Sequence, residues 1–207
     1  MVMADEDAAL ATSNVKAAAA DASKLIVANA DNALFKYLSS KPNNNPLSND
    51  VPPLSSRKDF VAANTLVDYM KGLNDGRLGS FFSKNGSGEF AGGVYGFVNA
   101  YDKFSTFSSK VIATTFAGNM LDAAEVNFLL AEAVERGMLS GSAEQYYNNA
   151  ITASYEYWGA TDVATYLAQP SVSYATATGT WKAKIGNQKW IALYNRPYDA
   201  WTSWRHL

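Results

Sequence analysis

The sequence contains no cysteine, a single histidine (His206) and no hydrophobic run long enough to cross a membrane as a helix. The absence of cysteine excludes disulfide bonds, thiolate metal sites and a cysteine nucleophile. One histidine next to the last residue excludes a His-rich metal cluster and argues against a Ser-His-Asp triad. The formal net charge is only -2, so no basic field favours binding to nucleic acid or to an anionic membrane.

The start of the chain also lacks the features of a signal peptide, because residues 1–8 are acidic where a basic start and an apolar core would be needed. We therefore interpret the protein either as cytoplasmic or as a piece of a longer precursor. Carboxylates and the histidine are not grouped at metal-ligand spacing, so neither a metal site nor a cofactor is expected.

The first third of the chain predicts one helix, one loop and a second helix. Residues 5–38 are rich in alanine and favour a helix of a bundle, in which only residues 25–37 have enough bulk to dock firmly. Residues 41–56 hold four of the six prolines and predict an extended surface loop. Ser56 and Asp59 have the spacing of a capping box, so we expect the second helix to begin there and to end at residues 74–76.

The strongest helical patterns lie in the second half of the chain. Asp122 is expected to cap a helix that ends at Gly137, and Ser142 is expected to cap another that ends at Gly159. The short connection between them predicts an antiparallel hairpin, in which small residues face Tyr and Trp as in tetratricopeptide pairs. A short helix should follow at residues 162–169. The predicted fold class is therefore mostly α, built of tetratricopeptide-like antiparallel helix hairpins.

The closing stretch, residues 181–207, holds four of the five tryptophans. Its apolar residues recur at helical spacing, and Pro197 is expected to split it into two helices. The spacing predicts that most of these rings are core. We nevertheless expect Trp201 and Trp204 to be under-covered.

Residues 76–118 interrupt this helical pattern as a long Gly/aromatic loop insertion with short strands at most. The glycines at residues 92–96 match neither the dinucleotide nor the P-loop spacing, so they do not indicate phosphate binding. Aromatic platforms with a few polar groups suit a small-ligand site, and flat rings stack on the apolar faces of sugars. The residues that we expect to bind a ligand are Tyr95, Phe97, Asn99 and Tyr101.

One pair of carboxylates tests the possibility of an enzyme. Glu125 and Glu132 lie on one helical face about two turns apart, which is within the range of an inverting glycosidase pair. Helices usually carry such a polar stripe because one face meets water, so we expect no catalytic residues and no enzyme.

Several motifs together resemble the SusD/RagB-like nutrient-binding outer-membrane lipoproteins. The resemblance covers most of the chain from about residue 45 onward. Its motifs are LDAAEVNFLLAEAVERG at 121–137, YYNNAI at 146–151, IGNQKWIALY at 185–194, DAWTSWR at 199–205, RKDFVAANTLVD at 57–68 and NDGR at 74–77. The chain departs from the family pattern in having no signal peptide or lipid-bearing cysteine, in lacking the earlier helices and the usual C-terminal segment, and in having Gly76 where proline is common.

The resemblance implies a surface protein that binds a glycan or oligosaccharide and delivers it to a SusC-like TonB-dependent transporter. It also implies a bacterial outer-membrane location on the cell-surface side, with membrane attachment only through a lipid anchor absent from this chain. We expect residues 1–207 to form a single, partial SusD-like helical domain, a fragment of the middle to C-terminal part of the family, with residues 76–118 as an insertion. A protein-interaction scaffold of tetratricopeptide type and a glycosidase using Glu125 and Glu132 remain the alternatives.

Overall fold

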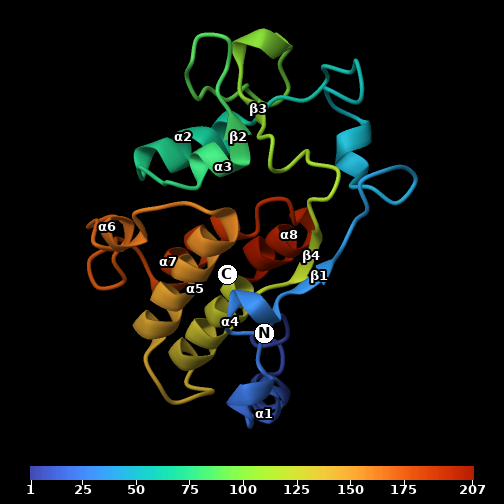
Figure 1. Cartoon of the computed structure of the whole chain (residues 1–207). Coiled ribbons are helices and arrows are strands. Elements are labelled where there is room, and N and C mark those ends of the chain that lie inside the picture. Colours follow the sequence, from blue (N-terminus) through green and yellow to red (C-terminus); the bar gives the residue numbers. More distant parts are fainter. The chain divides into compact units, whose positions relative to one another are not determined.

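The computed structural model describes the whole chain, residues 1–207, and is mostly helical, as the sequence predicts (Figure 1). The chain divides into two compact units. Unit 1 contains Met1–Ala33, Leu121–Tyr157 and Val163–Leu207, and unit 2 contains Leu34–Met120 and Trp158–Asp162. The single domain expected from the sequence stays a prediction.

The predicted hairpin is the centre of unit 1. Helix α4 spans Ala123–Glu135 and α5 spans Ala143–Trp158. The predicted cap at Asp122 is confirmed, because its Oδ1 accepts from the Glu125 amide at 2.8 Å. Gly137 has a φ of +71°, a left-handed conformation that allows the chain to leave α4. Figure 1 shows α4 and α5 as an antiparallel pair, and their Phe128 and Tyr147 rings meet edge to face with centroids 6.1 Å apart.

The closing stretch forms the two predicted helices of unit 1. Helix α7 spans Trp181–Ala192 and packs on α4, while α8 spans Pro197–His206 with its proline in the first turn. Ile185, Ile191 and Leu193 are buried, as a scaffold helix requires. Trp201 and Trp204 are 59% and 69% exposed, which confirms that they are under-covered. The predicted helix at residues 162–169 is shorter, because α6 spans only Val163–Leu167.

The expectation of one long N-terminal helix over residues 5–38 was wrong. Helix α1 spans only Ala8–Ala18, and residues 25–37 form turns and strand β1 (Ala33–Phe35). Polar side chains explain the difference, because Asn29 donates to the Ala153 carbonyl at 2.9 Å and Asn32 accepts from the Ala123 amide at 2.8 Å. Such side-chain bonds offer the backbone an alternative to the helix.

Unit 2 has two short α-helices and short strand pairings. Helix α2 spans Asn64–Gly72 and α3 spans Leu78–Phe81, so the glycine-rich insertion is mostly irregular but begins with one helical turn. Strand β2 (Phe82–Ser83) pairs with β3 (Thr106–Phe107), and β1 pairs with β4 (Gly118–Leu121). The ring of Trp158 packs against Phe81 and Phe116, with centroids 4.6 and 5.7 Å away, and closes the core of this unit.

The capping box predicted at Ser56 and Asp59 does not form. Helix α2 begins at Asn64, and its N-cap, Ala63, has no side-chain capping bond. Asp59 instead accepts a hydrogen bond from Arg57 at 2.7 Å. A competing ion pair therefore keeps residues 57–62 irregular, which brings Arg57 and Phe60 next to the aromatic insertion.

Candidate functional site

The base of the aromatic loop, residues 92–101, is fixed to the start of α2. The Gly93 amide donates to the Ala62 carbonyl at 2.8 Å, and the Asn64 amide donates to the Gly93 carbonyl at 2.9 Å. A Cβ at Gly92 would lie 2.3 Å from the Asn64 Cα, so only glycine fits where the two backbones meet. Gly92 thus serves close packing of the backbone.

Asn99 holds the loop in shape from within. Its Oδ1 accepts from the Val94 amide at 3.2 Å, and its Nδ2 donates to the carbonyls of Val94 and Phe97, both at 3.0 Å. Both polar ends of this side chain are therefore engaged by the loop itself. Asn99 is better described as a positioning residue than as a direct ligand contact.

Tyr95 and Phe97 extend from this loop into solvent. They are 70% and 74% exposed, and Val98 between Phe97 and Asn99 is fully exposed. Large rings held this far out on a braced loop are uncommon, because burial of an aromatic side chain is normally favourable. Both rings are therefore accessible, and that they bind a ligand stays a prediction.

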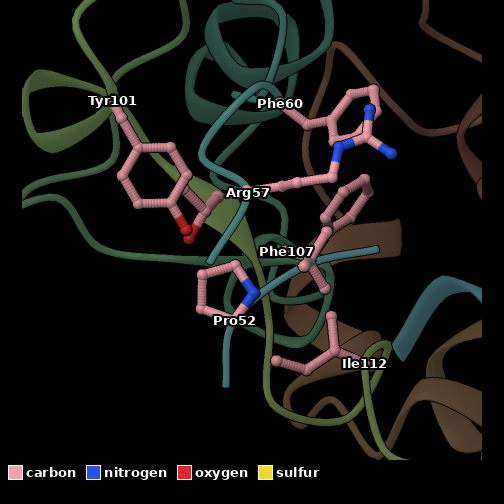
Figure 2. Close-up of a pocket in the computed structure, with 8 residues that line it drawn as sticks. Pro52, Arg57, Phe60, Tyr101, Phe107 and Ile112 are labelled. Atoms are coloured by element: carbon pink, nitrogen blue, oxygen red, sulfur yellow. The ribbon is translucent and has the colours of Figure 1, made fainter. Parts of the chain in front are cut away.

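Tyr101 lies at a small hollow beside the loop, not at its tip. It is partly buried, and the Lys58 ammonium lies 5.4 Å from the centre of its ring. Figure 2 shows the rings of Tyr101, Phe60 and Phe107 around the Arg57 side chain, with Pro52 and Ile112 completing the wall. The hollow has a volume of only about 30 Å³, roughly the share of one water molecule in the liquid. A sugar ring cannot enter it, so the surface around it is the part that a ligand could contact.

The charges beside the hollow are paired with one another. The Arg57 Nε donates to Asp59 at 2.7 Å, its Nη1 donates to Asp50 at 3.0 Å, and the guanidinium lies 5.4 Å from the Phe60 ring centre. The hydrogen bond to Asp59 is the main reason that the pKa of Arg57 is raised. Lys58 lies 3.8 Å from a carboxylate oxygen of Asp102. Two cations thus face three carboxylates, so this aromatic surface has no excess positive charge that would favour an anionic ligand.

Sequence reasoning selected Tyr95, Phe97 and Tyr101 but did not select Arg57 and Phe60, which line the small hollow together with Tyr101. The signal was the run at residues 57–60, in which three charged residues precede an aromatic ring and which we interpreted as a helix start. The ring of Phe60 is 42% exposed, unlike an apolar residue on the inner face of a helix.

The two carboxylates of the glycosidase alternative are not arranged for catalysis. The Glu132 side chain is fully buried and bonds Arg136 and His206 at 2.8 and 2.6 Å. Glu125 is ion-paired with Arg196. Both carboxylates are thus engaged within the protein, whereas a glycosidase needs two carboxyl groups that flank a sugar.

Two further observations concern metals and membranes. The structure has no group of three or more His, Asp or Glu side chains that could hold a metal ion. None of its helices combines the length and the apolar character needed to cross a membrane.

Comparison with known proteins identifies relatives over the full chain. A profile of the SusD-like family, described as "Starch-binding associating with outer membrane", matches residues 1–207. No curated protein matches the chain.

Solved structures resemble this fold closely. A SusD homolog from Bacteroides uniformis is 27% identical with a TM-score of 0.83, and the match covers 99% of this chain and 48% of that one. A chitin-binding SusD homolog from Flavobacterium johnsoniae is 26% identical with a TM-score of 0.79, covering 99% and 47%. A SusD homolog from Bacteroides vulgatus is 25% identical with a TM-score of 0.80, covering 98% and 47%. The chain thus spans about half the length of the solved structures that it matches.

Proposed function

Since this chain belongs to the SusD-like family of starch-binding proteins that associate with the outer membrane, we propose that it captures glycans on the aromatic loop at residues 92–101. The chain is not an enzyme, because this family binds carbohydrate without catalysing a reaction on it. The resemblance to a chitin-binding homolog supports a polysaccharide of neutral sugar units as the ligand.

The observation that carries the proposal is the exposure of Tyr95 and Phe97 on a loop that Asn99 braces. Their rings offer flat apolar faces to the C–H faces of a sugar, and little ordering of the loop is needed on binding. Tyr101, Arg57 and Phe60 would extend this surface next to the loop. The two carboxylates paired with Arg57 support recognition by stacking and hydrogen bonding and not by attraction of an anion.

Binding to soluble oligosaccharides tests this proposal. Maltohexaose and chitohexaose, with insoluble starch and chitin in parallel, are titrated into the wild type and into Tyr95→Ala and Phe97→Ala. We expect each substitution to weaken binding about tenfold, because loss of one stacking ring removes on the order of 1.4 kcal/mol. Tyr198→Ala is the matched control, since Tyr198 is 85% exposed but lies on α8. Unchanged affinity in both loop variants would contradict the proposal.

We further propose that the protein acts on the cell-surface side of the outer membrane and passes its glycan to a SusC-like TonB-dependent transporter. The family description, which associates these proteins with the outer membrane, supports this step. Co-purification of the chain with a TonB-dependent transporter from native outer membranes tests it. Recovery of the protein without any outer-membrane transporter would contradict it.

One observation favours the alternative of a protein-interaction scaffold. Helix α8 exposes Tyr198, Trp201 and Trp204 at intervals of three residues, and the two tryptophan rings stack with centroids 5.6 Å apart. A scaffold of this kind would lose a protein partner in Trp201→Ala while its affinity for every polysaccharide stayed the same. The titrations above therefore separate the two functions.

A further inference from the structure

A second and much larger hollow lies beside strand β1 in unit 2. Its volume is about 420 Å³, against about 30 Å³ for the hollow at Tyr101. Pockets that hold small ligands commonly measure about 300–1,000 Å³. This hollow is therefore large enough for a ligand ring, and none of the residues identified from the sequence as ligand contacts lines it.

Two aromatic rings form one corner of the hollow. The rings of Phe35 and Tyr37 meet edge to face, with centroids 5.2 Å apart and an angle of 69° between their planes. Phe35 is 59% exposed, whereas Tyr37 is partly buried. A Cβ at Gly118 would lie 3.3 Å from the Tyr37 hydroxyl, so the glycine leaves room for this ring. The exposed ring of Phe35 is thus supported from behind by Tyr37.

The opposite side of the hollow is held rigidly by the backbone and by buried asparagines. The Leu38 amide donates to the Asn43 carbonyl at 2.8 Å and closes the turn between them. The buried Asn44 side chain donates to the Ser48 hydroxyl at 2.8 Å, and Asn45 donates to the Val111 carbonyl at 2.9 Å. A site with walls fixed in this way binds without a large ordering cost.

Two polar side chains of the hollow are free to contact a ligand. The side chains of Lys36 and Asn43 are exposed and have no hydrogen-bond or ion-pair partner in the structure. This differs from the smaller hollow, where Arg57 and Lys58 each face a carboxylate. An ammonium group and an amide beside an exposed ring are the donors and acceptors that sugar hydroxyls require.

We propose that this hollow is a second carbohydrate subsite, in which one sugar unit stacks on Phe35 and hydrogen-bonds to Asn43 and Lys36. The inference rests on the proposed glycan-binding function and adds a second point of contact in the same unit. Both hollows are tied to the same stretch of backbone, because Asn45 bonds the carbonyls of Val111 and Ala113, which flank Ile112 in the wall of the smaller hollow.

The test measures binding and its location together. Maltohexaose and chitohexaose are titrated into the wild type, Phe35→Ala and Phe35→Leu, and the backbone amide resonances are followed by nuclear magnetic resonance. We expect the amides of residues 35–43 to shift in the wild type, and both variants to bind about tenfold more weakly. Phe35→Leu keeps apolar bulk but removes the flat ring, so it separates stacking from folding. Leu54→Ala is the control, because Leu54 is 53% exposed in the same unit and lines neither hollow.

The outcomes distinguish this inference from the proposed function. Wild-type affinity in both Phe35 variants, together with weakened binding in Tyr95→Ala and Phe97→Ala, would overturn the second subsite and leave the function intact. Saturation with either saccharide without any shift at residues 35–43 would also overturn it. Absence of binding to any saccharide by the wild type would contradict the proposed function, and the subsite with it.

Discussion

The turn after α2 holds a fully buried ion pair, and its removal gives a large predicted effect on stability. The side chains of Asp75 and Arg77 are both 0% exposed. The Arg77 Nε donates to Oδ1 of Asp75 at 2.9 Å and its Nη2 donates to Oδ2 at 2.6 Å, while the Arg77 amide donates to Oδ1 at 2.9 Å. These hydrogen bonds fix the loop that leads into α3. Helix α3 places Phe81 in the core of unit 2.

We predict that Asp75→Asn lowers the free energy of unfolding by about 3–5 kcal/mol, the usual cost of breaking a buried ion pair. The asparagine keeps an oxygen that can accept from the Arg77 amide, so the loss comes mainly from removing the negative charge that faces the buried guanidinium. Because a domain of this kind is stable by only about 5–15 kcal/mol, the variant should unfold at a much lower urea concentration.

Urea unfolding followed by circular dichroism measures this effect. The control is Asp59→Asn, which breaks the pair with Arg57 at the surface and should leave the transition unchanged, because exposed pairs contribute little. The double variant Asp75→Asn/Arg77→Met should recover most of the lost stability, since it removes both buried charges and keeps most of the buried volume. Equal midpoints for Asp75→Asn and Asp59→Asn would refute the argument.

Three further predictions concern other parts of the chain. Gly92→Ala should lower the free energy of unfolding by about 1–3 kcal/mol, because the new Cβ would overlap the Asn64 backbone. Gly72→Ala, in open space at the end of α2, should leave the stability unchanged or raise it. Thermal unfolding of the two variants compares these effects. Burial lowers the pKa of Lys189 below 10.5, so the unfolded chain binds the ammonium proton more tightly than the folded chain does. The free energy of unfolding should therefore rise as the pH increases toward 10.5. In Lys189→Met, urea titrations from about pH 7 to 10 should lack this rise. Asn99→Ala should increase proteolysis of the aromatic loop and weaken saccharide binding with little change in global stability, and cleavage equal to that of the wild type would contradict its bracing role.

The sequence predicted the helical scaffold of unit 1 well, because local signals there agree with tertiary packing. The cap at Asp122, the stop at Gly137 and the restart at Pro197 each act within one turn of a helix. The aromatic side chains of this hairpin are also in the core, since Phe128 and Tyr147 are buried. Sequence patterns predict the structure correctly where residues close in sequence determine it.

The N-terminal segment and residues 56–62 could not be predicted in the same way, because distant partners decide their structure. Asn29 and Asn32 bond residues about 90–130 positions away, and this pairing overrides the helical preference of the alanine-rich segment. Arg57 likewise removes Asp59 from the expected capping box. The spacing of a capping box does not reveal whether its acidic residue forms an ion pair with another side chain.

The candidate site was predicted in part. Tyr95 and Phe97 were identified because a glycine-rich stretch without helical spacing does not bury its rings in a regular core. Phe35 was not selected, because residues 25–37 were interpreted as the part of a helix with enough bulk to dock. The strand β1 reverses that assignment, since Phe35 faces solvent beside the larger hollow.

The polar stripe on α4 shows why charge spacing alone is a weak indicator of catalysis. Glu125 and Glu132 recur two turns apart because both ends of α8 are attached to this face of α4. Arg196, which precedes the first turn of α8, pairs with Glu125, and His206, in its last turn, lies 2.6 Å from Glu132. The stripe is therefore neither a water-facing surface nor a reaction centre. Carboxylates that are engaged in this way hold one helix on another, and the same spacing that resembled a glycosidase pair is the spacing that docking of α8 requires.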